Sequence, residues 1–66
     1  MGYCTINGEQ RQAAGMTVTA LLAEMRLGGQ KLAVEKNGAV IPKSRHDDEI
    51  LAEGDIIEIV AAVGGG

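Results

Sequence analysis

Apolar side chains recur at helical spacing in one segment of the chain. Four of them fall at positions i, i+3, i+4 and i+7 and form one stripe: Val18, Leu21, Leu22 and Met25. This spacing predicts an amphipathic helix. Thr17 precedes the stripe and can accept a backbone N–H as an N-cap, and Gly28-Gly29 is typical of a helix C-terminus. We expect the stripe to pack into the core, because a small domain needs such a helix to cover its sheet.

Short apolar runs bounded by turn residues predict strands on both sides of this helix. The first run is Tyr3–Asn7. Two further runs, Leu32–Lys36 and Ala39–Ile41, are separated by Asn37-Gly38. This dipeptide is typical of a two-residue type I′ turn. The two runs therefore predict a hairpin.

The last strand is expected over Ile56–Val60, a run rich in β-branched residues. Its alternation places Ile57 and Ile59 on one face. The opposite row consists of Ile56, Glu58 and Val60. We expect one row to join the core and the other to be partly exposed.

Polar segments connect these elements. After an Asn7-Gly8 turn, residues 9–13 form a short return strand, and Pro42 ends the hairpin because proline lacks an N–H donor. Residues 42–51 read as a crossing segment with one helical turn. Together these elements predict an α+β fold, a mixed sheet of four to five strands with one main helix packed across it.

The length of 66 residues fits one small domain and excludes a multi-domain enzyme. A chain this short buries only about 60% of its unfolded surface, which argues against a deep substrate cavity. No apolar run approaches the roughly 20 residues of a membrane span, and no signal segment precedes the domain. We expect a soluble, cytoplasmic protein that is a monomer when free.

Cys4 is the single cysteine, so an internal disulfide and a thiol-based metal cluster are excluded. In the first strand Cys4 and Ile6 share the inner face. No cationic residue lies close in sequence to lower the pKa of the thiol. We interpret Cys4 as a small core residue.

The charges are unevenly distributed along the chain. Residues 1–45 hold six bases and three acids, a net charge of +3, whereas residues 46–66 hold six acids and no base, a net charge of −6. An acidic C-terminal third repels phosphate backbones and favours a basic protein groove. With Tyr3 as the one aromatic residue available for stacking, nucleic acid is excluded as a partner. The alternative is that these acids merely solvate one face.

His46, Asp47 and Asp48 form the one cluster that resembles a set of metal ligands. Three consecutive residues lack the spacing of a structural zinc site, so we predict no metal and interpret His46 as a surface residue. The sequence also has no phosphate-binding Gly-Lys-Ser/Thr loop and no catalytic triad motif.

Three glycines, Gly64, Gly65 and Gly66, end the chain. Taken alone, such a run is a flexible end or a remnant of cloning. Here it directly follows the last strand through residues 61–63. Glycines without a Cβ can thread a narrow channel and deliver the α-carboxylate of Gly66 into another protein's active site. We therefore divide the chain into a domain, 1–63, and a tail, 64–66.

Taken together, these segments resemble the bacterial thiamine-biosynthesis sulfur carriers of the ThiS family, which have the ubiquitin-like β-grasp fold. The resemblance covers nearly the whole chain, in the same order and spacing. It departs at Lys43, where arginine is frequent, and at Lys36, a strand position that is often apolar. The shared motifs are residues 7–9, 14–18 with Leu21-Leu22, 37–42, 51–60 and 62–66.

The resemblance implies a carrier and not an enzyme. An ATP-dependent adenylyltransferase of the ThiF type would join Gly66 to AMP, and a persulfide donor would convert the adenylate into a thiocarboxylate. A thiazole synthase of the ThiG type would then take the sulfur for the thiazole of thiamine. This chain would bind no cofactor itself, because ATP and Mg²⁺ would belong to the activating partner.

On the same resemblance, the outward row of the last strand is the candidate docking surface for these partners. The candidate residues are Ile56, Glu58, Val60 and Val63, with Asp55 beside them. Two alternatives stay open: a sister sulfur carrier for molybdopterin, tRNA thiolation or amino-acid biosynthesis, and a β-grasp interaction module or protein modifier.

Overall fold

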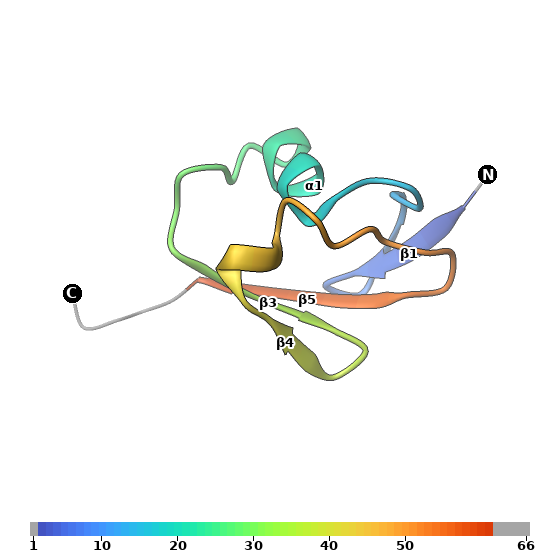
Figure 1. Ribbon diagram of the computed structural model, residues 1–66. Coiled ribbons are helices and arrows are strands. Elements are labelled where there is room, and N and C mark those ends of the chain that lie inside the picture. The colour runs from blue at the N-terminus through green and yellow to red at the C-terminus, as the bar shows by residue number, and fades with distance from the viewer. Residues whose placement is uncertain (1, 62–66) are drawn as a thin grey trace.

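A computed structural model describes residues 2–61 of the chain (Figure 1). Within these residues lie one α-helix, α1 (Val18–Glu24), and one short 3₁₀ helix, η1 (Lys43–Arg45). The strands are β1 (Tyr3–Ile6), β2 (Glu9–Gln12), β3 (Leu32–Lys36), β4 (Ala39–Ile41) and β5 (Ile56–Ala61).

The five strands formed by residues 2–61 make one sheet in the order β2-β1-β5-β3-β4. β5 runs parallel to β1 and antiparallel to β3, and the hairpins β1-β2 and β3-β4 are antiparallel. α1 lies across one face of the sheet, and the segment after η1 crosses on the same face (Figure 1). The predicted α+β sheet with one helix packed across it is confirmed.

The core lies between α1 and the sheet. The apolar stripe of α1 contributes Val18, Leu21 and Leu22, and β5 contributes Ile57 and Ile59. The helical stripe and the inward row of the last strand therefore pack as the alternation predicts. The remaining buried apolar residues of the described chain come from the other strands and the connections: Cys4, Ile6, Ala13, Val34, Ile41 and Leu51.

α1 begins where the sequence predicts but ends earlier. Thr17 is the N-cap, and its Oγ1 accepts a backbone N–H at 3.0 Å. The last helical residue is Glu24, and Arg26 adopts the left-handed conformation with a φ of 62°. Two N–H groups then close the last turn, from Arg26 to Ala23 O and from Leu27 to Leu22 O. The prediction that Gly28-Gly29 ends the helix is wrong, because this pair of hydrogen bonds completes a Schellman cap before the glycines are reached.

Both predicted Asn-Gly turns are confirmed. The φ angles are 49° and 86° at Asn7 and Gly8, and 53° and 88° at Asn37 and Gly38. Positive φ at both central residues is the requirement of a type I′ turn, which asparagine and glycine tolerate best. The two turns set the registers of the two hairpins.

The crossing segment contains the predicted helical turn, η1, but His46 behind it is not a surface residue. Its side chain is 7% exposed, and Nε2 donates a hydrogen bond to Ile41 O at 3.0 Å. The prediction was wrong because η1 folds the chain back over the end of β4, where the ring satisfies a buried carbonyl. Within residues 2–61, no helix has the length and apolar character needed to cross a membrane.

Candidate functional site

The candidate site predicted from the sequence is the outward row of β5 and the residues after it. Ile56, Glu58 and Val60 are all exposed, which confirms their outward orientation. Val63 and residues 64–66 lie outside the described part of the chain. The docking role of the row and the chemistry of the tail therefore stay predictions.

This row occupies the middle of the sheet face opposite α1. Ile56 is 53% exposed and Val60 is 54% exposed. Across the antiparallel register, Glu58 lies opposite Glu35 of β3. Glu35 in turn lies opposite Val40 of β4. The face therefore mixes exposed aliphatic side chains with carboxylates.

Two asparagine side chains hold β5 in place where neighbouring strands end. Asn7 accepts the N–H of Ile59 at 2.7 Å and donates to the carbonyl of Ile59 at 3.1 Å. Asn37 accepts the N–H of Ile56 at 2.9 Å. Each amide therefore acts as a short extension of the sheet. Sequence reasoning identified these residues as turn formers and missed this second role.

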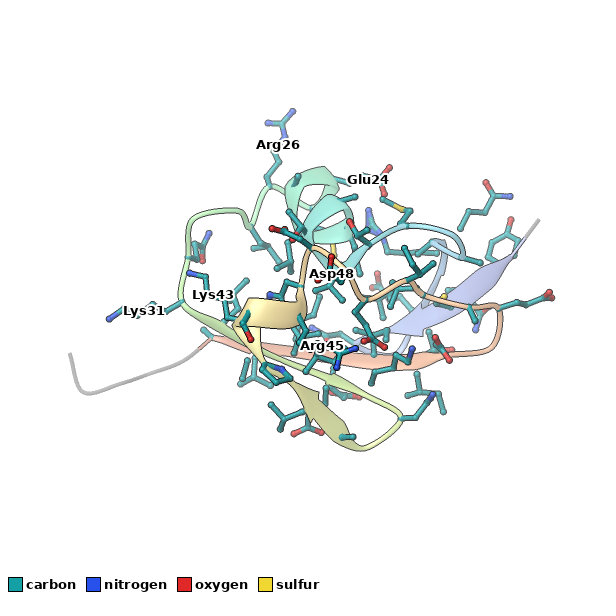
Figure 2. The ribbon with its side chains drawn as sticks, viewed as in Figure 1. Glu24, Arg26, Lys31, Lys43, Arg45 and Asp48 are labelled. Atoms are coloured by element: carbon teal, nitrogen blue, oxygen red, sulfur yellow. The ribbon has the colours of Figure 1, made fainter. Side chains whose placement is uncertain are left out.

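β5 ends at Ala61, which pairs with Leu32 at the start of β3. Two lysines lie toward this end of the molecule, Lys31 before β3 and Lys43 in η1 (Figure 2). Two lysine side chains therefore lie near the point where the described chain leaves the sheet.

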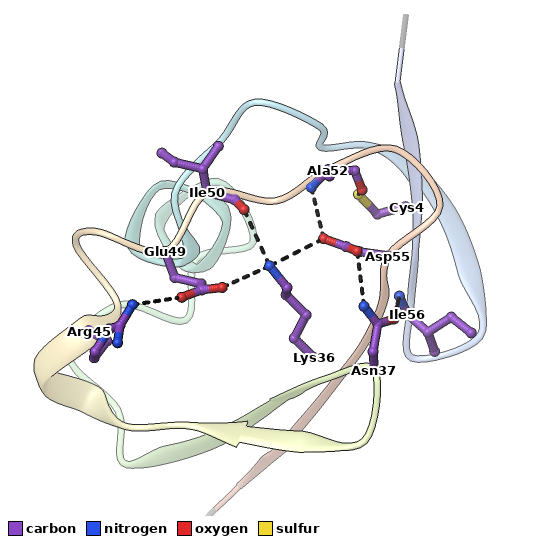
Figure 3. A network of polar contacts seen from close by, with 9 residues as sticks. All are labelled: Cys4, Lys36, Asn37, Arg45, Glu49, Ile50, Ala52, Asp55 and Ile56. Atoms are coloured by element: carbon purple, nitrogen blue, oxygen red, sulfur yellow. Dashed lines mark hydrogen bonds and ion pairs between the residues drawn. The ribbon is translucent and has the colours of Figure 1, made fainter.

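A second charged group lies at the other end of β3, around the ammonium group of Lys36 (Figure 3). Lys36 Nζ is 2.7 Å from Glu49 Oε2 and 3.6 Å from Asp55 Oδ2. Asp55 also accepts the N–H of Ala52 at 2.8 Å and Asn37 Nδ2 at 3.0 Å. This network attaches the crossing segment to the sheet.

The network removes Asp55 from the docking candidates. Asp55 is only 9% exposed, and its two carboxylate oxygens bind partners within the domain. The sequence interpretation was wrong because Asp55 precedes β5, in a turn that points its carboxylate toward Ala52 and Lys36. Lys36, the departure from the family pattern, supplies the charge that this carboxylate needs.

The network shifts the pKa values of its members in opposite directions. The hydrogen bond to Glu49 raises the pKa of Lys36 and lowers that of Glu49. Burial alone raises the pKa of Asp55, but the bonds from Ala52 and Asn37 and the charge of Lys36 outweigh it, so this pKa is lowered.

The lowered carboxylate pKa values predict loss of stability in acid. A carboxylate whose pKa is lower in the folded state stabilises the fold above its unfolded pKa, about 3.9 for Asp and 4.3 for Glu. We expect the free energy of unfolding to be constant from about pH 8 to 5 for these groups and to fall below about pH 4. Asp55→Asn is expected to cost about 1–3 kcal/mol at pH 7 and to flatten the acid decrease.

Urea denaturation between pH 2.5 and 8 measures this dependence. The control is Asp48→Asn, since Asp48 is exposed and its carboxylate has no hydrogen bond or ion pair within residues 2–61. An acid decrease of the same size in Asp55→Asn and the unaltered chain would contradict the assignment.

Cys4 is a core residue, as predicted. It is 1% exposed, and Sγ donates to Ala52 O at 3.2 Å. Burial, followed by the nearby charge of Asp55, raises the pKa of the thiol. Since the thiolate is the reactive form, this side chain is not suited to carry sulfur.

Residues 2–61 contain no group of three or more His, Cys, Asp or Glu side chains arranged to hold a metal ion. Two members of the sequence cluster of His46, Asp47 and Asp48 bind partners within the domain. Asp47 accepts a hydrogen bond from the hydroxyl group of Thr19, and His46 donates one to the carbonyl oxygen of Ile41. A cavity of about 280 Å³ lies beside them, between α1 and η1, and its lining includes Leu22, Leu27 and Leu32.

Comparison with known proteins places the chain in one family. The model of the ThiS family matches residues 4–66. The sulfur carrier protein ThiS of Bacillus subtilis is 42% identical over 50 residues, which cover 76% of each chain. A crystal structure of the thiamine biosynthesis protein ThiS from Geobacter metallireducens superimposes with a TM-score of 0.81 and 29% identity, covering 97% of this chain and 99% of that one.

Two longer relatives are named thiazole synthase. The protein from Paramagnetospirillum magneticum is 48% identical over 62 residues, and that from Magnetococcus marinus is 40% identical over 62 residues. Each match covers 92% of this chain and 19% of the relative. The chain therefore spans about a fifth of the length of these synthases.

The structural match also confirms the ubiquitin-like β-grasp fold that the sequence resemblance implied. The family model covers far more than half of the chain, and its match extends through the final glycines. On these grounds the chain belongs to the ThiS family.

Proposed function

We propose that the chain is a sulfur carrier for the thiazole of thiamine, with the carboxylate of Gly66 as the group that carries sulfur. The observation that carries this proposal is the family match, which continues from the folded domain through Gly66. The carrier from Bacillus subtilis, 42% identical over 50 residues, supports the same function. The protein is then a substrate of its partners and not an enzyme.

The chemistry begins with activation, because a carboxylate is a poor electrophile. A ThiF-type adenylyltransferase transfers AMP from ATP to the carboxylate of Gly66 and releases pyrophosphate. The product is a mixed anhydride with AMP as a good leaving group. ATP and Mg²⁺ are bound by this enzyme, and this chain contributes no cofactor site.

Sulfur enters in the next step. The terminal sulfur of a protein persulfide attacks the acyl carbon of Gly66 and displaces AMP. A thiol then attacks the remaining S–S bond, which releases the thiocarboxylate and leaves a disulfide on the donor side. The buried thiol of Cys4 takes no part, since it is 1% exposed.

The domain contributes position. β5 is the central strand, and Asn7 and Asn37 fix its backbone through side-chain hydrogen bonds. A partner that binds Ile56, Glu58, Val60 and Val63 would hold the strand that precedes the glycines 64–66 in sequence. Positioning of this kind converts a bimolecular step into an effectively unimolecular one.

The consumer is a thiazole synthase of the ThiG type. Support comes from the two longer relatives of that name, each of which contains a segment similar to nearly all of this chain. A carrier and a synthase that work in sequence gain effective concentration when they share one chain. We place this chain in the cytoplasm, as a monomer when free.

Transfer to the synthase tests the pathway. Sulfur-loaded chain is mixed with a ThiG-type thiazole synthase and its other substrates, and the thiazole product and the state of Gly66 are measured. We expect thiazole to form as the thiocarboxylate returns to a carboxylate. Covalent attachment of the chain to lysines of other proteins, without sulfur transfer, would identify a protein modifier instead.

A further inference from the structure

Two carboxylates lie side by side on the sheet face opposite α1. Glu35 of β3 and Glu58 of β5 are direct partners in the antiparallel register. The next pair along, Val34 and Ile59, is buried, so strand alternation places both glutamates on the outward face. Directly opposed side chains have their Cβ atoms roughly 4.5–5.5 Å apart.

No cation within residues 2–61 neutralises this pair. Neither glutamate forms an ion pair in the described part of the chain. Lys36 follows Glu35 in sequence, but alternation puts its ammonium group on the other face, where Glu49 and Asp55 bind it. Like charges directly opposite each other destabilise a sheet. The free domain therefore retains an unfavourable pair at this position.

Exposed aliphatic side chains surround the pair. Ile56 and Val60 flank Glu58 along β5, with exposures of 53% and 54%, and Val40 lies beyond Glu35 with 65%. Exposed apolar side chains gathered around polar groups are typical of a protein-binding surface. The same face contains the row Ile56, Glu58 and Val60 that the proposed function assigns to docking.

We propose that this face binds the ThiF-type adenylyltransferase through an arginine of that enzyme, which inserts between Glu35 and Glu58, with aliphatic contacts to Ile56, Val60 and Val40. The inference rests on the proposed function and specifies its docking step. A guanidinium fits better than an ammonium group for two reasons. Its planar fork can donate to two carboxylates at once, and its weak hydration suits an aliphatic surround.

A docking role for Glu35 and Glu58 predicts opposite changes in stability and in binding when one of them is replaced, which a purely structural role does not. Repulsion between them destabilises the free domain and is relieved in the complex. Replacing Glu58 by a cation removes the repulsion and creates an attractive cross-strand pair with Glu35. The same change places a cation against the arginine of the partner. Stability and binding therefore move in opposite directions.

The test compares Glu58→Lys with Glu24→Lys. Glu24 is exposed at the end of α1, on the other side of the sheet (Figure 2). Its substitution by lysine makes the same change in net charge but leaves the proposed binding face unaltered. The probe is a ThiF-type adenylyltransferase. Three quantities are measured: the urea midpoint of the free chain, the Kd for the enzyme without ATP, and the KM for adenylation at two salt concentrations.

For Glu58→Lys we expect a raised urea midpoint and a Kd and KM at least tenfold higher at low salt, with a smaller effect at high salt. For Glu24→Lys we expect less than a twofold change in Kd. Glu35→Gln should raise the midpoint and weaken binding in the same directions. An unchanged Kd in Glu58→Lys, or weakened binding together with a lowered midpoint, would overturn the proposal.

Failure of the proposed function gives a different result. If the enzyme binds the unaltered chain but forms no adenylate on it, the activation step is refuted while the binding comparison still tests the face. If the enzyme adenylates the unaltered chain and Glu58→Lys equally well, the carrier function stands and the arginine site is refuted.

Discussion

Deletion of Gly65 and Gly66 is expected to abolish sulfur loading, with no detectable thiocarboxylate after incubation with adenylyltransferase, ATP and a persulfide donor. The physical reason is reach. The carboxylate must arrive at the AMP-transfer site of the partner, and two residues of extended chain correspond to about 7 Å. A shortfall of that size separates the reacting groups, and a misplacement of even 1 Å can cost about 10²-fold in rate.

The deletion should leave the fold intact, because the buried core residues within residues 2–61 all lie between Cys4 and Ile59. The urea midpoint of the truncated chain therefore serves as the control and is expected to match that of the full chain. A second control replaces Gly66 with alanine. This substitution keeps the length of the chain, and the C-terminal carboxylate stays the same number of residues from the domain. Sulfur loading retained by the truncated chain would show that the tail is not the carrier group.

Ile57→Ala is expected to unfold a large fraction of the protein. Ile57 is 0% exposed and lies on the central strand, opposite Ile6 of β1 and Lys36 of β3. Truncation of a buried isoleucine costs about 2–5 kcal/mol. A core of this size rarely supplies more than about 3–5 kcal/mol in total. The measurement is the urea unfolding transition followed by far-ultraviolet circular dichroism.

The neighbour on the same strand provides a matched control. Ile56 is 53% exposed and points to the other face, so Ile56→Ala should change the free energy of unfolding by only about 0.5 kcal/mol. Ile57→Val, with an expected cost of about 0.5–1.5 kcal/mol, keeps the comparison measurable if the alanine variant does not fold. Equal effects of the alanine substitutions at 56 and 57 would contradict the inward and outward assignment of β5.

The sequence predicted the fold well where local signals agree with burial. Thr17 begins the helix, and Asn37-Gly38 forms the predicted turn. The alternation of β5 identified the buried Ile57 and Ile59. At these positions the local spacing of apolar residues, or the residue types of a single turn, determines the structure. The local sequence is therefore sufficient to predict it.

The predictions failed where the folded chain, and not a local periodicity, sets the partners of a side chain. The sequence makes Asp55 a docking candidate, but Ala52, Asn37 and Lys36 engage its carboxylate. His46 was read as a surface residue, but Ile41 O binds its ring. Asn37 and Lys36 come from the β3-β4 hairpin, far from Asp55 in sequence. Ala52 and Ile41 are close in sequence to Asp55 and His46, but these contacts depend on the shape of the intervening turns.

The candidate site was predicted in part for the same reason. The alternation of β5 predicts that Glu58 faces outward, and the family resemblance makes this outward row the docking candidate. Glu35 was not identified, because its position opposite Glu58 depends on the pairing of β3 with β5, two strands separated in sequence by β4 and the crossing segment. The register between strands that are far apart in sequence has no local sequence signal. The pairing of Glu35 with Glu58 is therefore known only from the structure of the sheet.

The most direct test of the central claim is the chemical state of Gly66. The chain is purified from cells that contain its adenylyltransferase and sulfur donor, and its intact mass and C-terminal fragments are measured by mass spectrometry. Fragments are needed because oxidation of Met16, Met25 or Cys4 adds nearly the same mass as replacement of oxygen by sulfur. We expect sulfur in place of one oxygen on the fragment that contains Gly66. An unmodified Gly66 under these conditions would contradict the carrier function.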